Sequence, residues 1–296
     1  MNKTALGVLI PALALGSVAV TAGCMSACCL PGPGANVTAV VNATAAHDPE
    51  KRVSIETSNG NVEVIHADTD IVTVRADFRV TSQERAGLVD VSTSRGEDGT
   101  LVIAPVWPDN RRQSNESCSL VVTMPRGAGL RIDTSNGEIE VGPGFGGSAS
   151  LDTSNGSVTV TDFDGPLTAR SSNGEIVLRD VGNCDAKTSN GSITVTLRDD
   201  ATGPVQLGSS NGEITLTVGP AFRGRAACST SNGSVSTRGT MTVTSSARNS
   251  AAIDFGDGPS SYVESSNGSI TVIKKDATGN STSAQRHGEN EIDERK

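Results

Sequence analysis

The chain has 296 residues and a formal net charge of −9, and aromatic residues make up only 2% of it. Nucleic-acid binding requires clustered Lys and Arg, so this charge argues against a nucleic-acid partner. The length allows one large domain or two ordinary ones, and the many Ser, Thr, Val and Gly residues favour β structure.

The first 23 residues have the pattern of a secretory signal peptide. Lys3 precedes an apolar run over residues 5–20, which is too short for a convincing membrane span. The run ends in TAGC, which resembles the bacterial lipobox and predicts lipid attachment at Cys24. Cys28, after Ser-Ala, is a second candidate, and secretion without a lipid stays an alternative. We therefore expect an exported, membrane-anchored lipoprotein of the cell envelope.

The next segments lack a clear repeat. Residues 24–50 are rich in Pro, Gly, Ala and Asn, which predicts a lipid anchor and flexible linker. Residues 51–130 are expected to form an irregular β cap. Its strand candidates are residues 71–80, 88–91, 101–106 and 118–124, and the polar run 108–117 is expected to be an exposed loop.

Ser-Asn-Gly occurs eight times in the chain. The first copy contains Asn59, and the others form an array over residues 131–273 with a period of about 19 residues. The array asparagines are Asn136, Asn155, Asn173, Asn190, Asn211, Asn232 and Asn267, and the glycines that follow them are Gly137, Gly156, Gly174, Gly191, Gly212, Gly233 and Gly268. Asn249, with Ser250 after it, divides the last gap and is interpreted as a degenerate repeat. Residues 274–296 are expected to form a disordered charged tail.

Aligned on the Asn as position 0, the repeats alternate with period two. Positions −6 and −4 are apolar or small, position −2 is always Ser or Thr, and position −3 is mostly charged. This pattern predicts a strand with one buried face, and by the same parity the Asn side chain points inward. After the Gly, apolar residues fall at +3 and +5, so we expect the Gly to absorb the change of parity with a positive φ.

Two architectures compete for this pattern. Asn-Gly between strands is typical of a hairpin, but the recurrence of one residue class at −6, −4, +3 and +5 favours stacked coils. We therefore predict an all-β fold, a parallel β-solenoid with coils of about 19 residues. Successive asparagines would lie about 4.8 Å apart and form an inward hydrogen-bonded ladder. A row of exposed asparagines that binds sugar is the alternative.

The repeats and the segment before them resemble the bacterial putative-adhesin domain family. The resemblance covers about residues 51–273, and its most specific part is SLVVTMPRGAGLRIDTSNGEIEV at 119–141. It implies a parallel β-solenoid on the envelope side of the membrane. We expect a non-catalytic scaffold that presents a surface for adhesion or interaction, with envelope-stress sensing as an alternative. The family has no established catalytic residues, so none are transferred to this chain.

The residues themselves predict neither catalysis nor a bound cofactor. No His lies near a carboxylate pair in the array, so a polysaccharide-acting enzyme is only an alternative. Residues 254–258, DFGDG, match a turn better than a Ca²⁺ site. Cys184 and Cys228 would be buried thiols two coils apart, too far for a disulfide, and Cys118 has no evident partner. The expected partners are the membrane, through the lipid anchor, and an unidentified envelope, glycan or protein ligand.

Overall fold

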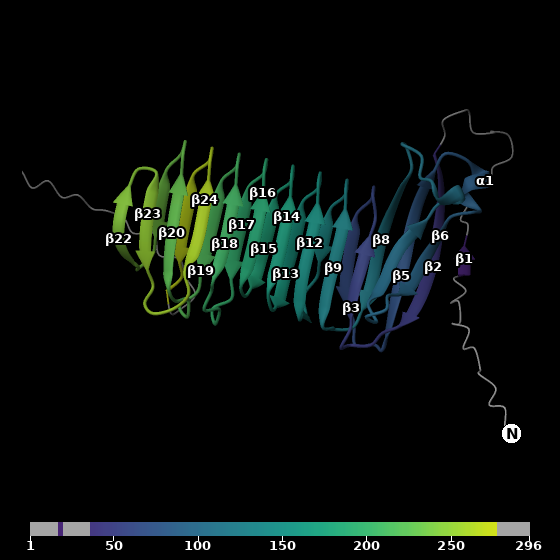
Figure 1. Ribbon diagram of the computed structural model, residues 1–296, viewed down its shortest axis with the longest axis horizontal. Helices are drawn as coiled ribbons and strands as arrows, with labels where there is room; N and C mark the ends of the chain where they lie inside the picture. Colours follow the sequence, from purple (N-terminus) through teal and green to yellow (C-terminus); the bar gives the residue numbers. More distant parts are fainter. Residues whose placement is uncertain (1–16, 20–35, 277–296) are drawn as a thin grey trace, which may run out of the picture.

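The computed structural model describes residues 17–19 and 36–276, and it shows a parallel β-solenoid (Figure 1). Each coil contributes one strand to each of two sheets, which face each other across the core. The predicted fold class is therefore confirmed. Cys24, Cys28 and residues 277–296 of the predicted tail lie outside the described residues.

Sheet A contains the strand that follows the Asn of each repeat, together with strands that lie outside the repeats. In spatial order they are β1 (Ser17–Ala19), β2 (Val37–Ala46), β5 (Ile71–Val80), β8 (Ser117–Met124), β4 (Val62–His66), β10 (Ile139–Val141), β13 (Val158–Asp164), β15 (Ile176–Val181), β17 (Ile193–Leu197), β19 (Ile214–Val218), β25 (Ile270–Lys274) and β21 (Val235–Arg238), and the short β11 (Phe145–Gly146) also pairs with β13.

Sheet B contains the strand that precedes the Asn of each repeat, together with strands that lie outside the repeats. Its order is β22 (Thr242–Ala247), β23 (Ser250–Asp254), β20 (Arg225–Thr230), β24 (Ser261–Ser265), β18 (Val205–Ser209), β16 (Cys184–Thr188), β14 (Leu167–Ser171), β12 (Ser148–Thr153), β9 (Gly129–Thr134), β3 (Arg52–Glu56), β7 (Leu101–Val106) and β6 (Asp90–Arg95). The helical segments are short: α1 (Gln83–Ala86) and the 3₁₀ turn η1 (Pro108–Asn110).

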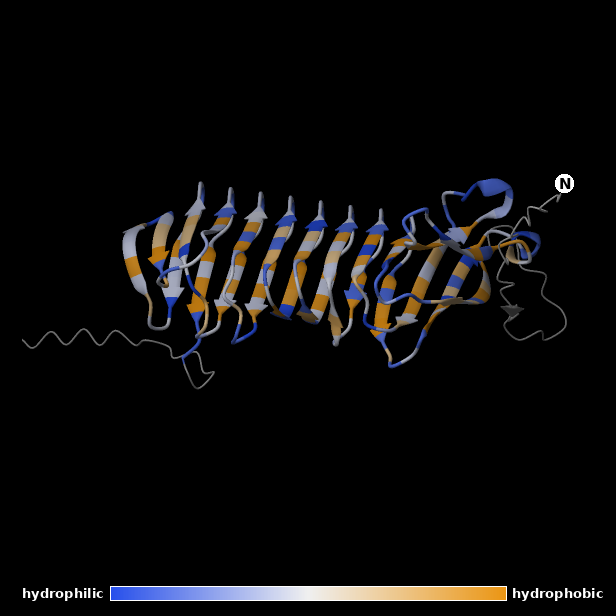
Figure 2. Ribbon diagram, turned by 60° about the horizontal axis from the view of Figure 1, so that its bottom comes forward, coloured by the Kyte–Doolittle hydropathy of each residue, from blue (hydrophilic) through white to orange (hydrophobic). Residues whose placement is uncertain are grey.

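The core forms because equivalent residues of successive coils lie in register. Ile176 at position +3, for example, is the Cα partner of Val158 on one side and Ile193 on the other, and all three are fully buried. Figure 2 shows the resulting alternation of apolar and polar residues along each strand. Burial of each such side chain contributes about 1.5–3 kcal/mol, so the stack is stabilised by contacts between neighbouring coils.

The last coils are not stacked in chain order. Strand β24 lies between β18 and β20, and β25 lies between β19 and β21, so the Asn267 coil separates the Asn211 coil from the Asn232 coil. The interpretation of Asn249 as a degenerate repeat is wrong, because Asn249 lies in the turn of the antiparallel hairpin β22–β23. With Asn249 as position 0, position +3 is Ala252 and position +5 is Asp254, whereas the coils have larger apolar residues at these two positions.

The N-terminal end combines parallel and antiparallel strands. The β3–β4 coil stacks directly on β9–β10, and β7 and β8 add one further parallel layer. Strands β5 and β7 have the predicted bounds, β8 begins one residue earlier than predicted, and β6 begins two residues later. The predicted linker is wrong for residues 37–46, which form β2 and pair antiparallel with β5. Their buried side chains are mostly Ala, so they carry little apolar signal.

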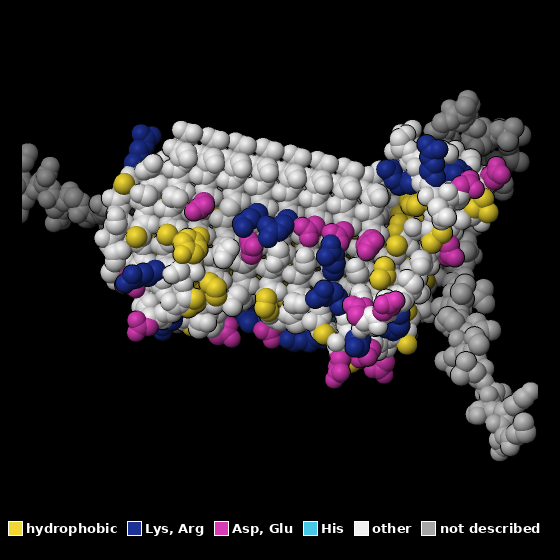
Figure 3. All heavy atoms as spheres, viewed as in Figure 1, with side chains coloured by type: hydrophobic (Ala, Val, Ile, Leu, Met, Phe, Trp, Pro, Cys, Tyr) yellow, Lys and Arg dark blue, Asp and Glu magenta, His cyan; other side chains and the backbone are white. Residues whose placement is uncertain are grey.

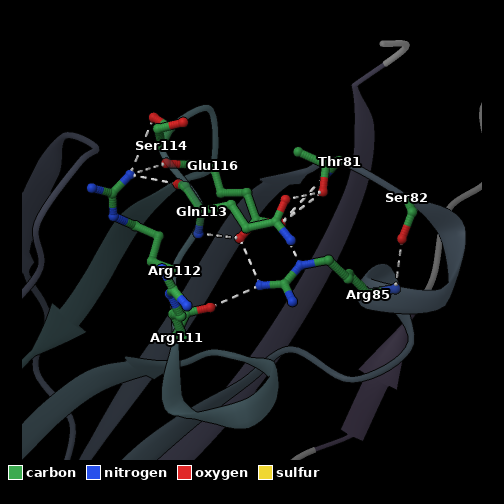
Figure 4. A network of polar contacts seen from close by, with 8 residues as sticks. All are labelled: Thr81, Ser82, Arg85, Arg111, Arg112, Gln113, Ser114 and Glu116. Atoms are coloured by element: carbon green, nitrogen blue, oxygen red, sulfur yellow. Dashed lines mark hydrogen bonds and ion pairs between the residues drawn. The ribbon is translucent and has the colours of Figure 1, made fainter. Parts of the chain in front are cut away.

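A buried ion pair connects the helix α1 to the loop that follows β7 (Figure 4). The Glu116 side chain is fully buried and accepts hydrogen bonds from Arg85 Nε at 2.6 Å and Nη2 at 2.8 Å. The backbone amides of Thr81 and Gln113 donate to the same carboxylate. Burial raises the pKa of Glu116, but these hydrogen bonds outweigh burial and hold the pKa at about 2. The carboxylate is therefore ionised and holds this end of the molecule together.

The cysteines of the described residues are expected to resist alkylation in the native protein. Cys118, Cys184 and Cys228 are buried free thiols. Because the Asn267 coil lies between the Asn211 and Asn232 coils, Cys184 and Cys228 are three strand spacings apart, about 14 Å. Burial raises the pKa of Cys184 and of Cys228 to about 12, so little reactive thiolate forms. Mass spectrometry after iodoacetamide treatment should find them labelled only in denaturant. A disulfide between Cys184 and Cys228 would show that the coil order is wrong.

Candidate functional site

The Ser-Asn-Gly corners form a solvent-facing edge along the whole stack. Position −2 is the last inward residue of the strand, and positions −1 and 0 both point outward, so all seven array asparagines are exposed. The predicted ladder is present: each array Asn donates a hydrogen bond from Nδ2 to Oδ1 of the Asn in the neighbouring coil, at 2.6–2.9 Å. Its predicted inward orientation is wrong, because strand parity does not continue through the corner.

The inward polar groups of the corner are the hydroxyls at position −2. Thr153 Oγ1 donates to the carbonyl of Gly137 in the adjacent coil at 3.0 Å, and Ser171 Oγ donates to Gly156 at 2.9 Å. The other coils repeat this contact. Each buried hydroxyl therefore has a partner, which avoids a penalty of about 1–3 kcal/mol for an unsatisfied group.

The corner glycines are required by close packing. The expected positive φ occurs only at Gly60, with φ +142°, and at none of the seven array glycines. At those seven, an added Cβ would lie 1.8–2.3 Å from the carbonyl oxygen of the corner glycine in the adjacent coil. Neighbouring backbones thus approach too closely for any side chain.

Removal of one ladder rung is expected to have a modest effect on stability. Asn190→Ala removes the bonds to Asn173 and Asn211, but water can hydrate the exposed amides that remain, so we expect a loss of about 1 kcal/mol. Lys187→Ala, on the same coil, should change stability by less than about 0.5 kcal/mol. Urea melts of both variants provide the measurement. Equal effects would contradict a contribution of the ladder to stability.

A groove runs beside this edge on sheet B. Its two hollows, of about 990 and 500 Å³, meet at Lys187 and Thr188 and are lined by positions −3 to −1 of successive coils. One wall, the serine row, consists of Ser58, Ser135, Ser154, Ser172, Ser189, Ser210, Ser266 and Ser231. The other wall, the charged row at position −3, consists of Glu56, Asp133, Asp152, Arg170, Lys187, Gly208, Glu264 and Ser229.

The charged row changes sign along the groove. Three acidic residues are followed by two basic residues, and Glu264 lies further along; Figure 3 shows acidic and then basic side chains below the corner edge. Arg170 and Lys187 share Asp185 as a partner, at 3.0 and 3.6 Å, so the pair keeps a net positive charge. These side chains are partly exposed and can exchange their partners for a ligand at small cost.

The end of the groove near β7 contains an aromatic side chain. Trp107 lines this end together with Pro105, and its ring packs edge-to-face on the buried Phe78 with ring centroids 5.2 Å apart. Packing on a core residue gives Trp107 a fixed position. Such a ring offers a flat apolar surface to a ligand that enters the groove.

Two acidic residues of the groove have hydrogen-bond partners within their own strands. Asp133 accepts from Arg131 at 2.7 Å and Asp152 accepts from Ser150 at 3.3 Å. Asp152 and Asp133 are Cα partners on adjacent strands, and they form part of a row of mixed charge along the groove. The serine row was not predicted, because strand parity was assumed to continue through the corner. The charged residues at position −3 were the sequence signal that pointed to the groove.

Two further sequence interpretations can be compared with the structure. Asp254 Oδ1 accepts from the backbone amide of Gly256 at 2.9 Å, the contact of a turn, as the DFGDG sequence indicates. Within residues 17–19 and 36–276, no cluster of His, Cys, Asp and Glu suited to a metal ion is present. In the same described part of the chain, no helix has the length and apolar character needed to cross a membrane.

The fold and the groove together define an elongated repetitive β protein with a surface groove parallel to its axis. The sequence model of the family described as Toastrack DUF4097 matches residues 50–248, and the chain belongs to this family. The expected relation to a putative-adhesin domain family is thereby confirmed. No curated protein matches the chain.

Several solved structures are similar to the chain at low sequence identity. A putative adhesin from Bacteroides fragilis is 12% identical, with 79% of this chain and 97% of that chain covered and a TM-score of 0.45. A putative lipid binding protein from Parabacteroides distasonis is 13% identical, with 78% and 96% covered and a TM-score of 0.34. A putative cell adhesion protein from Clostridium sporogenes is 10% identical, with 79% and 99% covered and a TM-score of 0.28.

Proposed function

We propose that this protein is a non-catalytic lipoprotein of the cell envelope whose groove binds an extended polymer. The observation that carries the proposal is the continuity of the groove, which presents a serine hydroxyl at every coil and a charged position −3 side chain at most of them. Because coils repeat about every 4.8 Å, a long ligand with regularly spaced polar groups fits this surface better than a compact one.

A linear glycan with charged substituents is the ligand class that the groove favours. The serine row offers donors and acceptors to sugar hydroxyls, and Trp107 offers a face for one ring at the end of the groove. Arg170 and Lys187 attract acidic groups on the ligand, while Asp133 and Asp152 favour amino groups further along. The change of sign gives the ligand a preferred direction.

Charge reversal in the groove tests this proposal. The double variant Arg170→Glu, Lys187→Glu should bind isolated envelope glycans at least about tenfold more weakly, a loss of about 1.4 kcal/mol. The control Arg179→Glu, Arg238→Glu makes the same change of net charge at exposed residues of sheet A. Its affinity should equal that of the wild type. Equal affinities of the two double variants, or tight binding of envelope proteins in place of glycans, would refute the glycan groove.

The anchor is tested separately. Cys24→Ala, with Cys28 also changed to Ala, should move the protein from the membrane fraction to the soluble fraction of the envelope. Unchanged membrane partition of the double variant would refute lipid attachment and would leave the groove proposal intact.

A further inference from the structure

The eight Ser-Asn-Gly corners contain the dipeptide most open to spontaneous deamidation. In Asn-Gly, the Gly backbone nitrogen can attack Cγ of the Asn side chain, because no Cβ on the Gly hinders the approach. The new N–C bond forms as ammonia leaves, and water then opens the cyclic imide to Asp or isoaspartate. No oxidant or enzyme is needed, and the seven array asparagines are exposed to the water that the reaction uses.

Interior rungs of the ladder hold the reacting amide in place at both ends. Asn190 donates from Nδ2 to Asn173 at 2.9 Å and accepts at Oδ1 from Asn211 at 2.9 Å. Cγ must turn toward the Gly nitrogen before it can react, and this rotation breaks both hydrogen bonds. The folded state therefore protects an interior asparagine.

The first rung is also protected. Asn59 Oδ1 accepts from Asn136, and the Gly60 nitrogen, which would be the attacking atom, donates to the Asn136 carbonyl at 3.2 Å. A Cβ at Gly60 would lie 2.0 Å from the Cys118 carbonyl oxygen, so this corner is tightly packed beneath the next layer.

Asn232 is the last rung and has only half of these contacts. Its Nδ2 donates to Asn267 Oδ1 at 2.8 Å, but within residues 36–276 no group donates to Asn232 Oδ1. The turn formed by residues 248–249 crosses this corner and uses backbone contacts alone: Thr230 N donates to the carbonyl of Asn249 and Val235 N to that of Arg248, both at 2.9 Å.

We propose that Asn232 is the site of spontaneous deamidation in the folded protein, and that the modification advances inward along the ladder. Conversion of Asn232 to an acid removes the Nδ2 donor of Asn267 Oδ1, so Asn267 becomes the next rung held at one end only. The inserted coil makes Asn267 the second site, although Asn211 is the preceding Ser-Asn-Gly repeat in the sequence.

Peptide mapping of the purified full chain after incubation at mildly alkaline pH tests the first step. We expect Asn232 to convert about fivefold faster than Asn173 or Asn190, the factor given by one net hydrogen bond. In denaturant, the rates at all Ser-Asn-Gly sites should converge. A native rate at Asn173 or Asn190 equal to that at Asn232 would overturn the proposal.

A variant pair tests the inward advance. In Asn232→Asp, the native deamidation rate at Asn267 should rise about fivefold, while the rate at Asn173 stays unchanged. The control Asn249→Asp adds the same charge to the nearby turn without altering the ladder, and it should leave Asn267 at its wild-type rate. An unchanged rate at Asn267 in Asn232→Asp, or the same increase in the control, would overturn the ladder mechanism.

Discussion

Replacement of Gly174 by Ala is expected to destabilise the protein by more than about 3 kcal/mol, or to prevent folding of the central coils. The new Cβ would lie 1.8 Å from the Gly156 carbonyl oxygen and 2.4 Å from the carbonyl carbon. Both are backbone atoms of the neighbouring coil, so the coils must separate to make room. Separation also breaks the hydrogen bond from Ser171 to Gly156 and disturbs the ladder beside it. Urea-induced unfolding followed by circular dichroism is the measurement.

Gly208→Ala is the matched control for this prediction. Gly208 lies on β18, and a Cβ there would lie 3.6 Å from Lys187 Cγ, an ordinary contact with a flexible side chain. We expect no loss of stability, and even a gain of up to about 1 kcal/mol, because Ala loses less backbone entropy than Gly on folding. Similar behaviour of Gly174→Ala and Gly208→Ala would show that the corner backbones are further apart than the structure shows.

Glu116→Gln is expected to cost about 3 kcal/mol of stability. The substitution removes the charged partner of Arg85, whose side chain is only 14% exposed and so keeps much of its charge away from water. Glu84→Gln, on the exposed surface of α1, is the control and should change stability by less than about 0.5 kcal/mol. A loss of similar size in the two variants would contradict the contribution of the Glu116 network.

The same network predicts a dependence of stability on pH. The pKa of Glu116 is about 2 in the folded protein, below its usual unfolded value, so its contribution is complete above the unfolded pKa. The unfolding free energy of the wild type should fall by up to about 3 kcal/mol as the pH falls from about 4.5 toward 2. The neutral amide of the Glu116→Gln variant binds no proton in this range, so the variant lacks this loss. The difference in unfolding free energy between wild type and Glu116→Gln should therefore shrink in acid. A constant difference across this pH range would contradict the low pKa.

The coil itself could be predicted because its apolar residues recur with strand parity. Ile176 and Ile193 occupy equivalent places in adjacent coils, and a parallel stack is the arrangement that brings such residues together. The inward orientation of the Ser or Thr at position −2 follows from the same parity. The parity argument failed at the corner, where Ser172 and Asn173 both turn outward. The serine row and the groove could not be predicted, because they depend on the outward orientation of position −1 at each corner.

The order of the last coils could not be read from the sequence. The Asn267 repeat has the same pattern as the others, and local residue preferences do not determine which neighbour a coil takes. Strand β20 is separated from β18 by one strand position, the hairpin β22–β23 continues the sheet on the far side of β20, and β24 then enters between β18 and β20. Strand β2 was missed for another reason: Ala39 and Ala43 are buried, but Ala carries a weak β signal.

The coil order determines which side chains meet in the groove, and paired cysteines test it most directly. Gln206 and Tyr262 are exposed partners on the adjacent strands β18 and β24, whereas Ala227 on β20 lies one strand further away. In a chain with Cys24, Cys28 and Cys29 replaced by Ser, Gln206→Cys, Tyr262→Cys should form a disulfide, because the two Cα atoms lie one strand spacing apart, about 4.8 Å. Gln206→Cys, Ala227→Cys should stay reduced, because its Cα atoms are about 9.6 Å apart. A disulfide in the second pair and none in the first would mean that the coils stack in chain order, and would contradict both the groove described for sheet B and the position of Asn232 at the end of the ladder.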